Sequence, residues 1–179
     1  MIVAGLDPGT RRCGFAVIRV VSTKMEIIEM GTWRLPEKES LGRRLEVLHQ
    51  ESTEFIRKYN PKIIGLEKAV AFKNVASALT LSEARGILRL SVFENLENAQ
   101  DRLVELSPTQ VKRSGVGSGN ANKASLEKFM QWRFGKPAEL MGAAASNSDA
   151  FDAMAIAWAA WIVHNGVLKR TLDERQTRP

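Results

Sequence analysis

The stretch "AGLDPGTRRCGFAVI" (residues 4–18) places a single carboxylate, Asp7, at the end of an apolar run. A Pro-Gly turn follows at once, and a second apolar run begins at about residue 14. Both runs have the length and β-prone composition of strands, and the short connection predicts a hairpin. An acid at the end of a buried strand is either a turn residue or a ligand, and the other acids of the chain bear on that choice.

Outward from this hairpin, the sequence alternates between strand and helix patterns. Three β-prone runs predict an antiparallel meander, and a helix capped by Ser40 follows them. The remaining expected elements are a buried strand over 62–67, a long helix over 75–95, a strand over 102–107, a short helix starting at Pro108, a helix over 124–134 and an Ala-rich helix over 148–165. This order predicts an α/β fold with a five-stranded mixed sheet that is covered by helices on both faces.

Composition and length bound the protein class. The 179 residues are 44% hydrophobic and 26% charged, which is typical of one soluble domain with a real core. We expect a single domain over 1–166 and a charged, disordered tail over 167–179. One cysteine excludes an internal disulfide framework, and no Cys/His spacing indicates zinc. The N-terminus resembles no leader and no apolar run could span a bilayer, so we expect a cytoplasmic protein without a membrane partner.

The charge balance points to a polyanionic partner. The net charge is +6, and a basic surplus of this size favours nucleic acid. Lys112, Arg113 and Lys123 lie in a basic region around the Gly-rich stretch "SGVGSGNANK" (114–123). This stretch lacks the Gly-Lys-Ser/Thr ending of a P-loop, so we interpret it as a DNA-facing loop. A solvated helix face is the alternative interpretation of these basic residues.

Four acids predict the chemistry. Asp7 and Glu67 both end apolar strands, where ligands bind in open α/β sheets, although each alone is also a common turn or cap residue. Asp149 and Asp152 lie three residues apart at the start of the Ala-rich helix, so both point along one face. Acids in a first helical turn often only offset the helix dipole. The rest of this helix is nearly all apolar, however, and should lie deep against the sheet.

Together these carboxylates predict a metal site. Four convergent acids without histidine or cysteine form a hard-oxygen site suited to Mg²⁺, with Mn²⁺ as a substitute. Such sites commonly hold two ions, which activate water and stabilise the leaving oxygen in phosphodiester cleavage.

At this point the sequence resembles the RuvC family of Holliday-junction resolvases, which are endonucleases with an RNase H-like fold. The resemblance spans roughly residues 1–165, and the motifs follow one another in family order. They are "GLDPGTRRCGFAVI" (5–18), "IIGLEKAVAFKNVASALTLSEARG" (63–86), "SPTQVKRSGVGSGNANK" (107–123) and "SDAFDAMAIAWA" (148–159).

The resemblance implies roles for individual residues. The metal-binding catalytic acids would be Asp7, Glu67, Asp149 and Asp152. Lys112 and Lys123 match basic positions near the scissile phosphate, and Lys123 would steady the charge that develops there. The expected activity is Mg²⁺-dependent cleavage of a four-way junction in recombination and repair, which leaves a 5′-phosphate.

The resemblance also implies a homodimer and a DNA-contacting segment. The helix bearing "NVASALTLSEARG" (74–86) would lie at the dimer interface, and we expect Leu81, Ala84 and Leu88 to contact the partner. The family often carries an aromatic wedge three residues after the strand-ending Glu. Here that position is Val70, and Phe72 lies two residues later. The DNA contacts would come from Val70, Phe72, Lys73, Asn74, Lys112, Arg113 and Lys123.

Two alternatives remain open at this stage. One is an RNase H-fold nuclease that acts on RNA, in the manner of the YqgF group, and the other is a non-catalytic protein that binds branched DNA. A two-lobed ATPase, which "GLDPGT" also suggests, is excluded because the chain has no room for a second lobe. A complex with a branch-migration helicase is a further expectation, and a phage-encoded member would act in the cytoplasm of the host.

The aromatic residues near the C-terminus predict packing. Trp132, Trp158 and Trp161 have apolar neighbours at helical spacing, so we expect core positions for all three. Cys13 is assigned to packing or to the surface, without a functional role.

Overall fold

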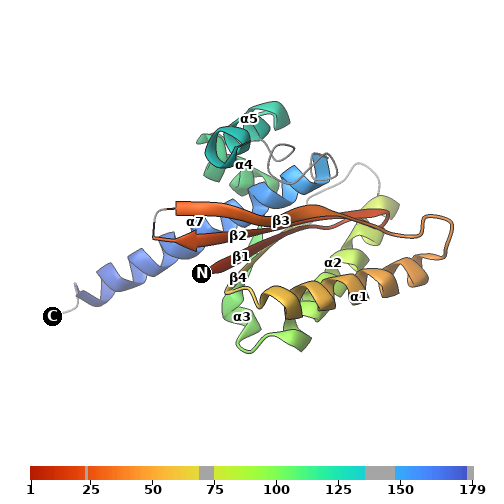
Figure 1. Cartoon of the computed structure of the whole chain (residues 1–179). Coiled ribbons are helices and arrows are strands. Elements are labelled where there is room, and N and C mark those ends of the chain that lie inside the picture. The colour runs from red at the N-terminus through yellow and green to blue at the C-terminus, as the bar shows by residue number, and fades with distance from the viewer. Residues whose placement is uncertain (23, 69–74, 136–147, 177–179) are drawn as a thin grey trace.

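The computed structural model describes residues 1–22, 24–68, 75–135 and 148–176, with side chains through residue 166. Figure 1 shows the chain from the N-terminal strands to the long C-terminal helix. The elements are β1 (Ile2–Asp7), β2 (Arg12–Val21), β3 (Lys24–Arg34), α1 (Leu41–Tyr59), β4 (Ile63–Glu67), α2 (Val75–Asn95), α3 (Ala99–Arg102), β5 (Leu103–Leu106), α4 (Pro108–Val116), α5 (Lys123–Phe134) and α7 (Ser148–Gln176).

The sheet has five strands in the order β3-β2-β1-β4-β5, which confirms the predicted mixed sheet. The strands β3, β2 and β1 form the antiparallel meander, whereas β4 and β5 run parallel to β1. Leu6 pairs with Leu66 across β1 and β4. Because parallel strands end at the same edge of a sheet, this register brings the residues after Leu6 and Leu66 side by side.

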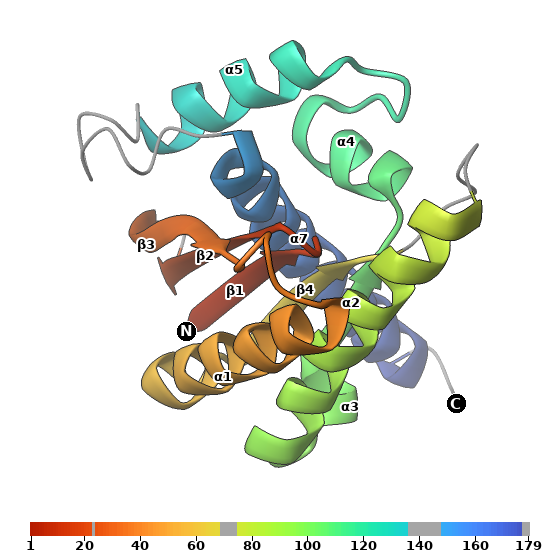
Figure 2. The ribbon, with the colours of Figure 1, turned by 90° about the vertical axis from the view of Figure 1, so that its right-hand side faces the viewer.

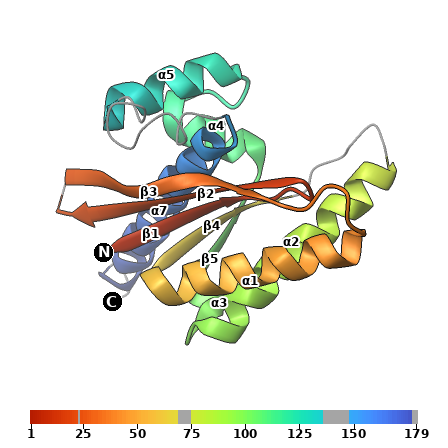
Figure 3. The ribbon, with the colours of Figure 1, turned by 45° about the vertical axis from the view of Figure 1, so that its right-hand side comes forward.

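Helices cover both faces of the sheet (Figure 2). The helices α1 and α2 pack on one face. Leu48 and Ile56 of α1 and Ala84 and Leu88 of α2 form a core there with side chains of the strands. On the opposite face α7 crosses the sheet, and α4 and α5 lie over α7 (Figure 3). This arrangement has the layers of an RNase H-like fold, as expected.

Capping residues define both ends of α1. The Ser40 hydroxyl accepts a hydrogen bond from the Arg43 amide at 3.3 Å and caps α1, and Asn60 ends it in the left-handed conformation. Between α1 and α2, the hydroxyls of Ser52 and Ser91 share a buried hydrogen bond of 2.7 Å. This polar contact fixes the relative position of two otherwise apolar helix faces.

On the second face, α7 approaches the sheet unusually closely. A Cβ atom at Gly5 of β1 would lie 2.0 Å from the Ala153 carbonyl oxygen, and one at Gly14 of β2 would lie 2.1 Å from the Asp149 carbonyl oxygen. A Cβ at Gly65 of β4 would lie 2.7 Å from the Ile156 carbonyl oxygen. Glycine is therefore required on three adjacent strands, because any side chain would push α7 away from the sheet.

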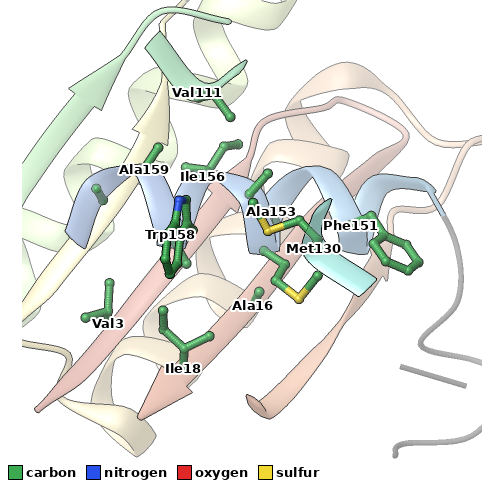
Figure 4. Packing of buried hydrophobic residues seen from close by; sticks show 14 of the residues in the cluster. Val3, Ala16, Ile18, Val111, Met130, Phe151, Ala153, Ile156, Trp158 and Ala159 are labelled. Atoms are coloured by element: carbon green, nitrogen blue, oxygen red, sulfur yellow. The ribbon is translucent and has the colours of Figure 1, made fainter. Parts of the chain in front are cut away.

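The helix complements these glycines with small side chains. Figure 4 shows Ala153, Ile156 and Ala159 of α7 among Val3, Ala16 and other side chains of this core. Alanine buries apolar surface without holding the helix away from the strands, which explains the Ala-rich composition of 148–160.

The aromatic residues only partly follow the sequence prediction. Trp158 is buried and donates a hydrogen bond to the Ser114 carbonyl oxygen at 2.8 Å, and Trp161 is half-buried against the same core. The prediction was wrong for Trp132, whose side chain is 79% exposed. The helix α5 turns Leu126 and Met130 toward the core, and Trp132 lies about 200° around the helix from Met130.

Two other elements differ from expectation. The short helix α3 was not predicted, and the backbone of α7 is helical to Gln176 rather than to about residue 165. The division into a domain over 1–166 and a disordered tail stays a prediction. None of the helices that the structure describes has the length and hydrophobicity of a membrane-spanning segment.

We predict that Gly5→Ala lowers the free energy of unfolding by about 3 kcal/mol, because the new methyl group meets helix backbone that cannot move aside. Chemical denaturation followed by circular dichroism measures the change. Gly42→Ala is the control: Gly42 has no neighbour within 4 Å of an added Cβ and lies in α1, so alanine should stabilise by about 0.5–1 kcal/mol. Equal effects of the two substitutions would contradict the close α7–sheet contact.

Candidate active site

A pocket of about 240 Å³ opens at the carboxyl edge of the sheet. Three of the predicted acids line it: Asp7 at the end of β1, Glu67 at the end of β4 and Asp152 in the first turns of α7. Two of the predicted basic residues, Lys112 and Lys123, line it as well. Its apolar wall consists of Pro108, Val111, Leu126 and Ile156.

The two lysines reach the pocket because two helices begin beside it. Ser107 and Gln110 form a reciprocal capping box at the start of α4, the helix that carries Lys112. Asn122 caps α5 by accepting a hydrogen bond of 2.8 Å from the Ser125 amide, and Lys123 is the first residue of this helix. The two caps therefore position the helices that bring the ammonium groups of Lys112 and Lys123 to the pocket.

Asp149 occupies a different position from the other three acids. Its backbone carbonyl lies over Gly14, the β2 residue that pairs with Asp7. Its carboxylate lies 3.6 Å from the Arg12 Nε atom and does not line the pocket. The first turn of α7 thus brings Asp149 next to Asp7, with its carboxylate on the side of Arg12.

Burial and mutual repulsion both raise the pKa values of acids in the pocket. Burial raises the pKa of Asp7 to about 8, and repulsion by Glu67, Asp152 and Asp149 adds to this rise. Burial also raises the pKa of Glu67 to about 7, with a further contribution from Asp152. Negative charge is therefore costly at this edge of the sheet unless a proton or a cation accompanies it.

Lys123 is the cation that the chain itself supplies. Its ammonium donates a hydrogen bond to the Asp152 carboxylate and another to the Ser148 hydroxyl at 3.1 Å. Burial raises the pKa of Asp152, and the hydrogen bond from Lys123 opposes that rise. Lys123 also lowers the pKa values of Asp7 and Glu67 through its charge, as does Lys112 for Glu67.

The donor set fits a hard divalent cation. The acids around the pocket offer only carboxylate oxygens, and their raised pKa values result from burial and mutual repulsion, which a cation would relieve. In the part of the chain that the structure describes, however, no three acidic, cysteine or histidine side chains already surround an ion position. Asp152 is engaged by Lys123 and Asp149 lies beside Arg12, so binding an ion would require these carboxylates to change partners.

The remaining predicted DNA contacts do not line the pocket or lie outside the described residues. Arg113 is exposed in the last turn of α4 and does not line the pocket. The predicted DNA contacts Val70, Phe72, Lys73 and Asn74 lie outside the described residues.

The predicted dimer contacts require a correction. Ala84 and Leu88 are fully buried in the chain's own core between α2 and the sheet, so no surface of either is left for a partner. Leu81 is only half-buried. The sequence of this helix did not indicate which of its apolar residues the sheet would cover.

Two arginines near the site were not predicted. Arg12 is the neighbour of Asp149, and Arg44 of α1 donates a hydrogen bond of 2.9 Å to the carbonyl oxygen of Thr10, in the turn that follows Asp7. The Arg11-Arg12 pair directly after "DPGT" was a usable signal for the first. No sequence signal distinguishes Arg44 from the other basic residues of α1.

Comparison with known proteins identifies the family. The family model described as crossover junction endodeoxyribonuclease RuvC matches residues 3–160. The chain is 33% identical over 132 residues to the RuvC protein of Natranaerobius thermophilus and covers 79% of that protein. It is 31% identical over 159 residues to the RuvC protein of Brachyspira hyodysenteriae, with 89% of this chain and 92% of the relative covered.

The fold also has a close counterpart among solved structures. The RuvC protein of T. thermophilus in complex with a Holliday junction substrate matches with a TM-score of 0.78 and 24% identity, over 93% of this chain and 96% of that chain. This match supports the RNase H-like arrangement of the sheet and helices.

We predict that the metal-free chain loses stability as the pH rises. The pKa of Asp7 in the folded state, about 8, lies above its ordinary value of 3.8. The folded chain therefore binds more protons than the unfolded chain between these values, and the free energy of unfolding falls as the pH rises from about 4 to about 8. Asp7→Asn should remove much of this loss and stabilise the metal-free chain by about 2–4 kcal/mol at pH 8.

Melting temperatures between pH 5 and pH 9 in a chelator measure this effect. Glu51→Gln, which alters an exposed carboxylate of α1, is the control and should follow the wild type. An Asp7→Asn chain that melts no higher than the wild type at pH 8 would contradict the raised pKa of Asp7.

Proposed function

The chain belongs to the RuvC family of crossover junction endodeoxyribonucleases, and from this premise we propose that it resolves four-way (Holliday) DNA junctions by paired nicks in strands of like polarity. The observation that carries the proposal is the pocket at the sheet edge, where Asp7, Glu67 and Asp152 converge with Lys112 and Lys123. Acids and cations together in one pocket suit a metal-assisted reaction at a phosphate.

The proposed metal ligands are Asp7, Glu67, Asp149 and Asp152. Mg²⁺, for which Mn²⁺ substitutes, is the proposed ion, and two per site is the proposed number because four carboxylates carry enough charge for a pair. When bound, divalent ions supply Lewis-acid stabilisation of the phosphate and a water activated for in-line attack. The products expected for this family are a 5′-phosphate and a 3′-hydroxyl.

The chain's own residues bind and orient the substrate. Lys112 and Lys123 place two positive charges at the pocket wall, where a phosphodiester can be held against the acids. Lys123 interacts with Asp152 in the free chain, so occupation of the acids by metal would release its ammonium to the scissile phosphate. Preorganised positive charge of this kind stabilises the charge that develops on the phosphate oxygens.

The family assignment favours DNA junction cleavage over the alternatives considered from sequence. An RNA-directed nuclease of the YqgF type would favour structured RNA over a four-way DNA junction in direct competition. A non-catalytic junction-binding protein would bind without nicking in Mg²⁺ or Mn²⁺. Association with a branch-migration helicase and a cytoplasmic location remain predictions.

The proposed homodimer uses the outer face of α2. Large apolar side chains lie exposed along this face at helical spacing: Val75 is 70% exposed, Leu79 62%, Leu90 47% and Phe93 49%. Gly86 lies between them and has open space around it. We call these five residues the α2 stripe. A stripe of this kind on one helix suits packing against a second copy of itself about a two-fold axis, which would pair two active sites on a four-way junction.

Asp7→Asn tests the catalytic assignment. We expect cleavage of a labelled mobile junction in Mg²⁺ to fall by at least about 10³-fold, because one ligand charge is lost from the site. Junction binding should persist or tighten, since a negative charge near phosphate has gone. Gel assays of nicking and of binding separate the two effects, and cleavage by this variant at the wild-type rate would refute the assignment.

Phe93→Glu tests the dimer. A charge in the α2 stripe should convert the dimer to a monomer at micromolar concentration, as measured by sedimentation equilibrium, because burying an unpaired carboxylate opposes association. Val21→Glu is the matched control, since Val21 is 60% exposed at the end of β2 and outside the stripe. A Phe93→Glu chain that remains dimeric would place the interface elsewhere.

A further inference from the structure

Arg85 of α2 contacts the strand end that carries Glu67. Its Nε atom donates a hydrogen bond of 3.0 Å to the backbone carbonyl oxygen of Glu67. Its terminal nitrogen forms an ion pair with the carboxylate of Glu105 on β5, and only 17% of its side chain is exposed. A single guanidinium therefore joins α2, the end of β4 and the neighbouring strand β5.

The end of β4 has few other attachments. The pairing of β4 with β1 ends at Leu66, one residue before Glu67, so the strand that carries Asp7 does not hold Glu67 in register. On the other side, Glu67 pairs with Leu106, and the Lys68 amide donates a hydrogen bond of 2.7 Å to the Leu106 carbonyl oxygen. Arg85 supplies the contact from the helix layer, a direction that the sheet cannot provide.

The chemistry of the contact suits a positioning role. A guanidinium is planar and always charged, and its fork can satisfy a carbonyl and a carboxylate at fixed relative angles. Glu105 neutralises the charge and orients the fork, while its own backbone lies in the strand beside β4. A lysine at this position would keep the charge but could not fix both acceptors with one rigid group.

We propose that Arg85 is a positioning residue: by holding the Glu67 carbonyl it sets the place of the Glu67 carboxylate relative to Asp7 and Asp152. Arg85 does not line the pocket, so it acts through Glu67 and not on the substrate. The proposal rests on the proposed function, in which Glu67 is a metal ligand. It also links the site to α2, the helix that bears the α2 stripe.

The chain offers a matched control in Arg89, one helical turn further along α2. The Arg89 Nε atom lies 3.7 Å from the same Glu105 carboxylate oxygen, and the side chain is 48% exposed. Among the residues that the structure describes, Arg89 forms its ion pair with Glu105, whereas the hydrogen bond to the Glu67 carbonyl comes from Arg85. Arg85→Gln and Arg89→Gln therefore remove the same charge beside Glu105, but only the first removes the contact with Glu67.

The first measurement is single-turnover cleavage of a labelled four-way junction with the full-length protein in excess. We expect Arg85→Gln to cut roughly 10–100-fold more slowly than the wild type, the range typical for loss of a residue that orients a metal ligand. Junction affinity should be unchanged, Arg89→Gln should cut at nearly the wild-type rate, and Arg85→Lys should recover part of the loss. The Mn²⁺ concentration for half-maximal rate should rise for Arg85→Gln only.

The second measurement is independent of cleavage. Mn²⁺ binding to the protein without DNA, followed by titration calorimetry, should be weakened by Arg85→Gln and not by Arg89→Gln. If Arg85→Gln does not fold, Glu105→Gln leaves the arginine in place and should show the same defect to a smaller degree. Where both variants fold, the double variant Arg85→Gln/Glu105→Gln should be no slower than Arg85→Gln, because the two residues act through one contact.

Equal rates and equal Mn²⁺ binding for Arg85→Gln and Arg89→Gln would overturn the positioning role while leaving the proposed function intact. A wild-type protein that nicks no junction in Mg²⁺ or Mn²⁺ would instead contradict the proposed function. In that case the Mn²⁺ titrations would still decide whether Arg85 organises the acids.

Discussion

The close contact between α7 and the sheet is the constraint on which the site depends. Gly5, Gly14 and Gly65 leave no side chain between the helix and three adjacent strands, and alanines on α7 complete the fit. Because the helix lies this near, its first turns bring Asp152 into the pocket at the strand ends. A sheet with ordinary side chains at these positions would hold the helix farther away, and the acids of α7 would then be separated from those of β1 and β4.

The same contact brings several carboxylates together, and the neighbouring cationic side chains compensate their negative charge only in part. Buried carboxylates that face one another keep raised pKa values, even with Lys123 donating to Asp152 and Arg12 lying beside Asp149. A fold without function would gain stability by replacing such acids with neutral residues. Buried acids at the carboxyl edge of a parallel strand pair agree with a site that binds a cation and a phosphate.

The helix α2 serves three purposes with three sets of residues. Ala84 and Leu88 pack in the core, the α2 stripe faces outward, and Arg85 lies between these faces with its guanidinium on the end of β4. Apolar residues therefore lie on both the buried side and the outer side of α2. The same helix carries the proposed dimer face and contacts the proposed metal ligand Glu67 through Arg85.

The sequence by itself determined the order of the strands and of the longer helices, the mixed five-stranded sheet and the convergence of Asp7 with Glu67, because strand periodicity and parallel pairing are local and geometric rules. The motif pattern also identified Asp152, Lys112 and Lys123. Only the tertiary structure decided that Trp132 faces solvent, that Ala84 and Leu88 are buried, that Asp149 lies beside Arg12, and that Arg44 and Arg85 reach the backbone near the acids. These outcomes depend on which face of a helix meets the sheet and on which long side chain finds a distant carbonyl, and neither is encoded in the spacing of neighbouring residues.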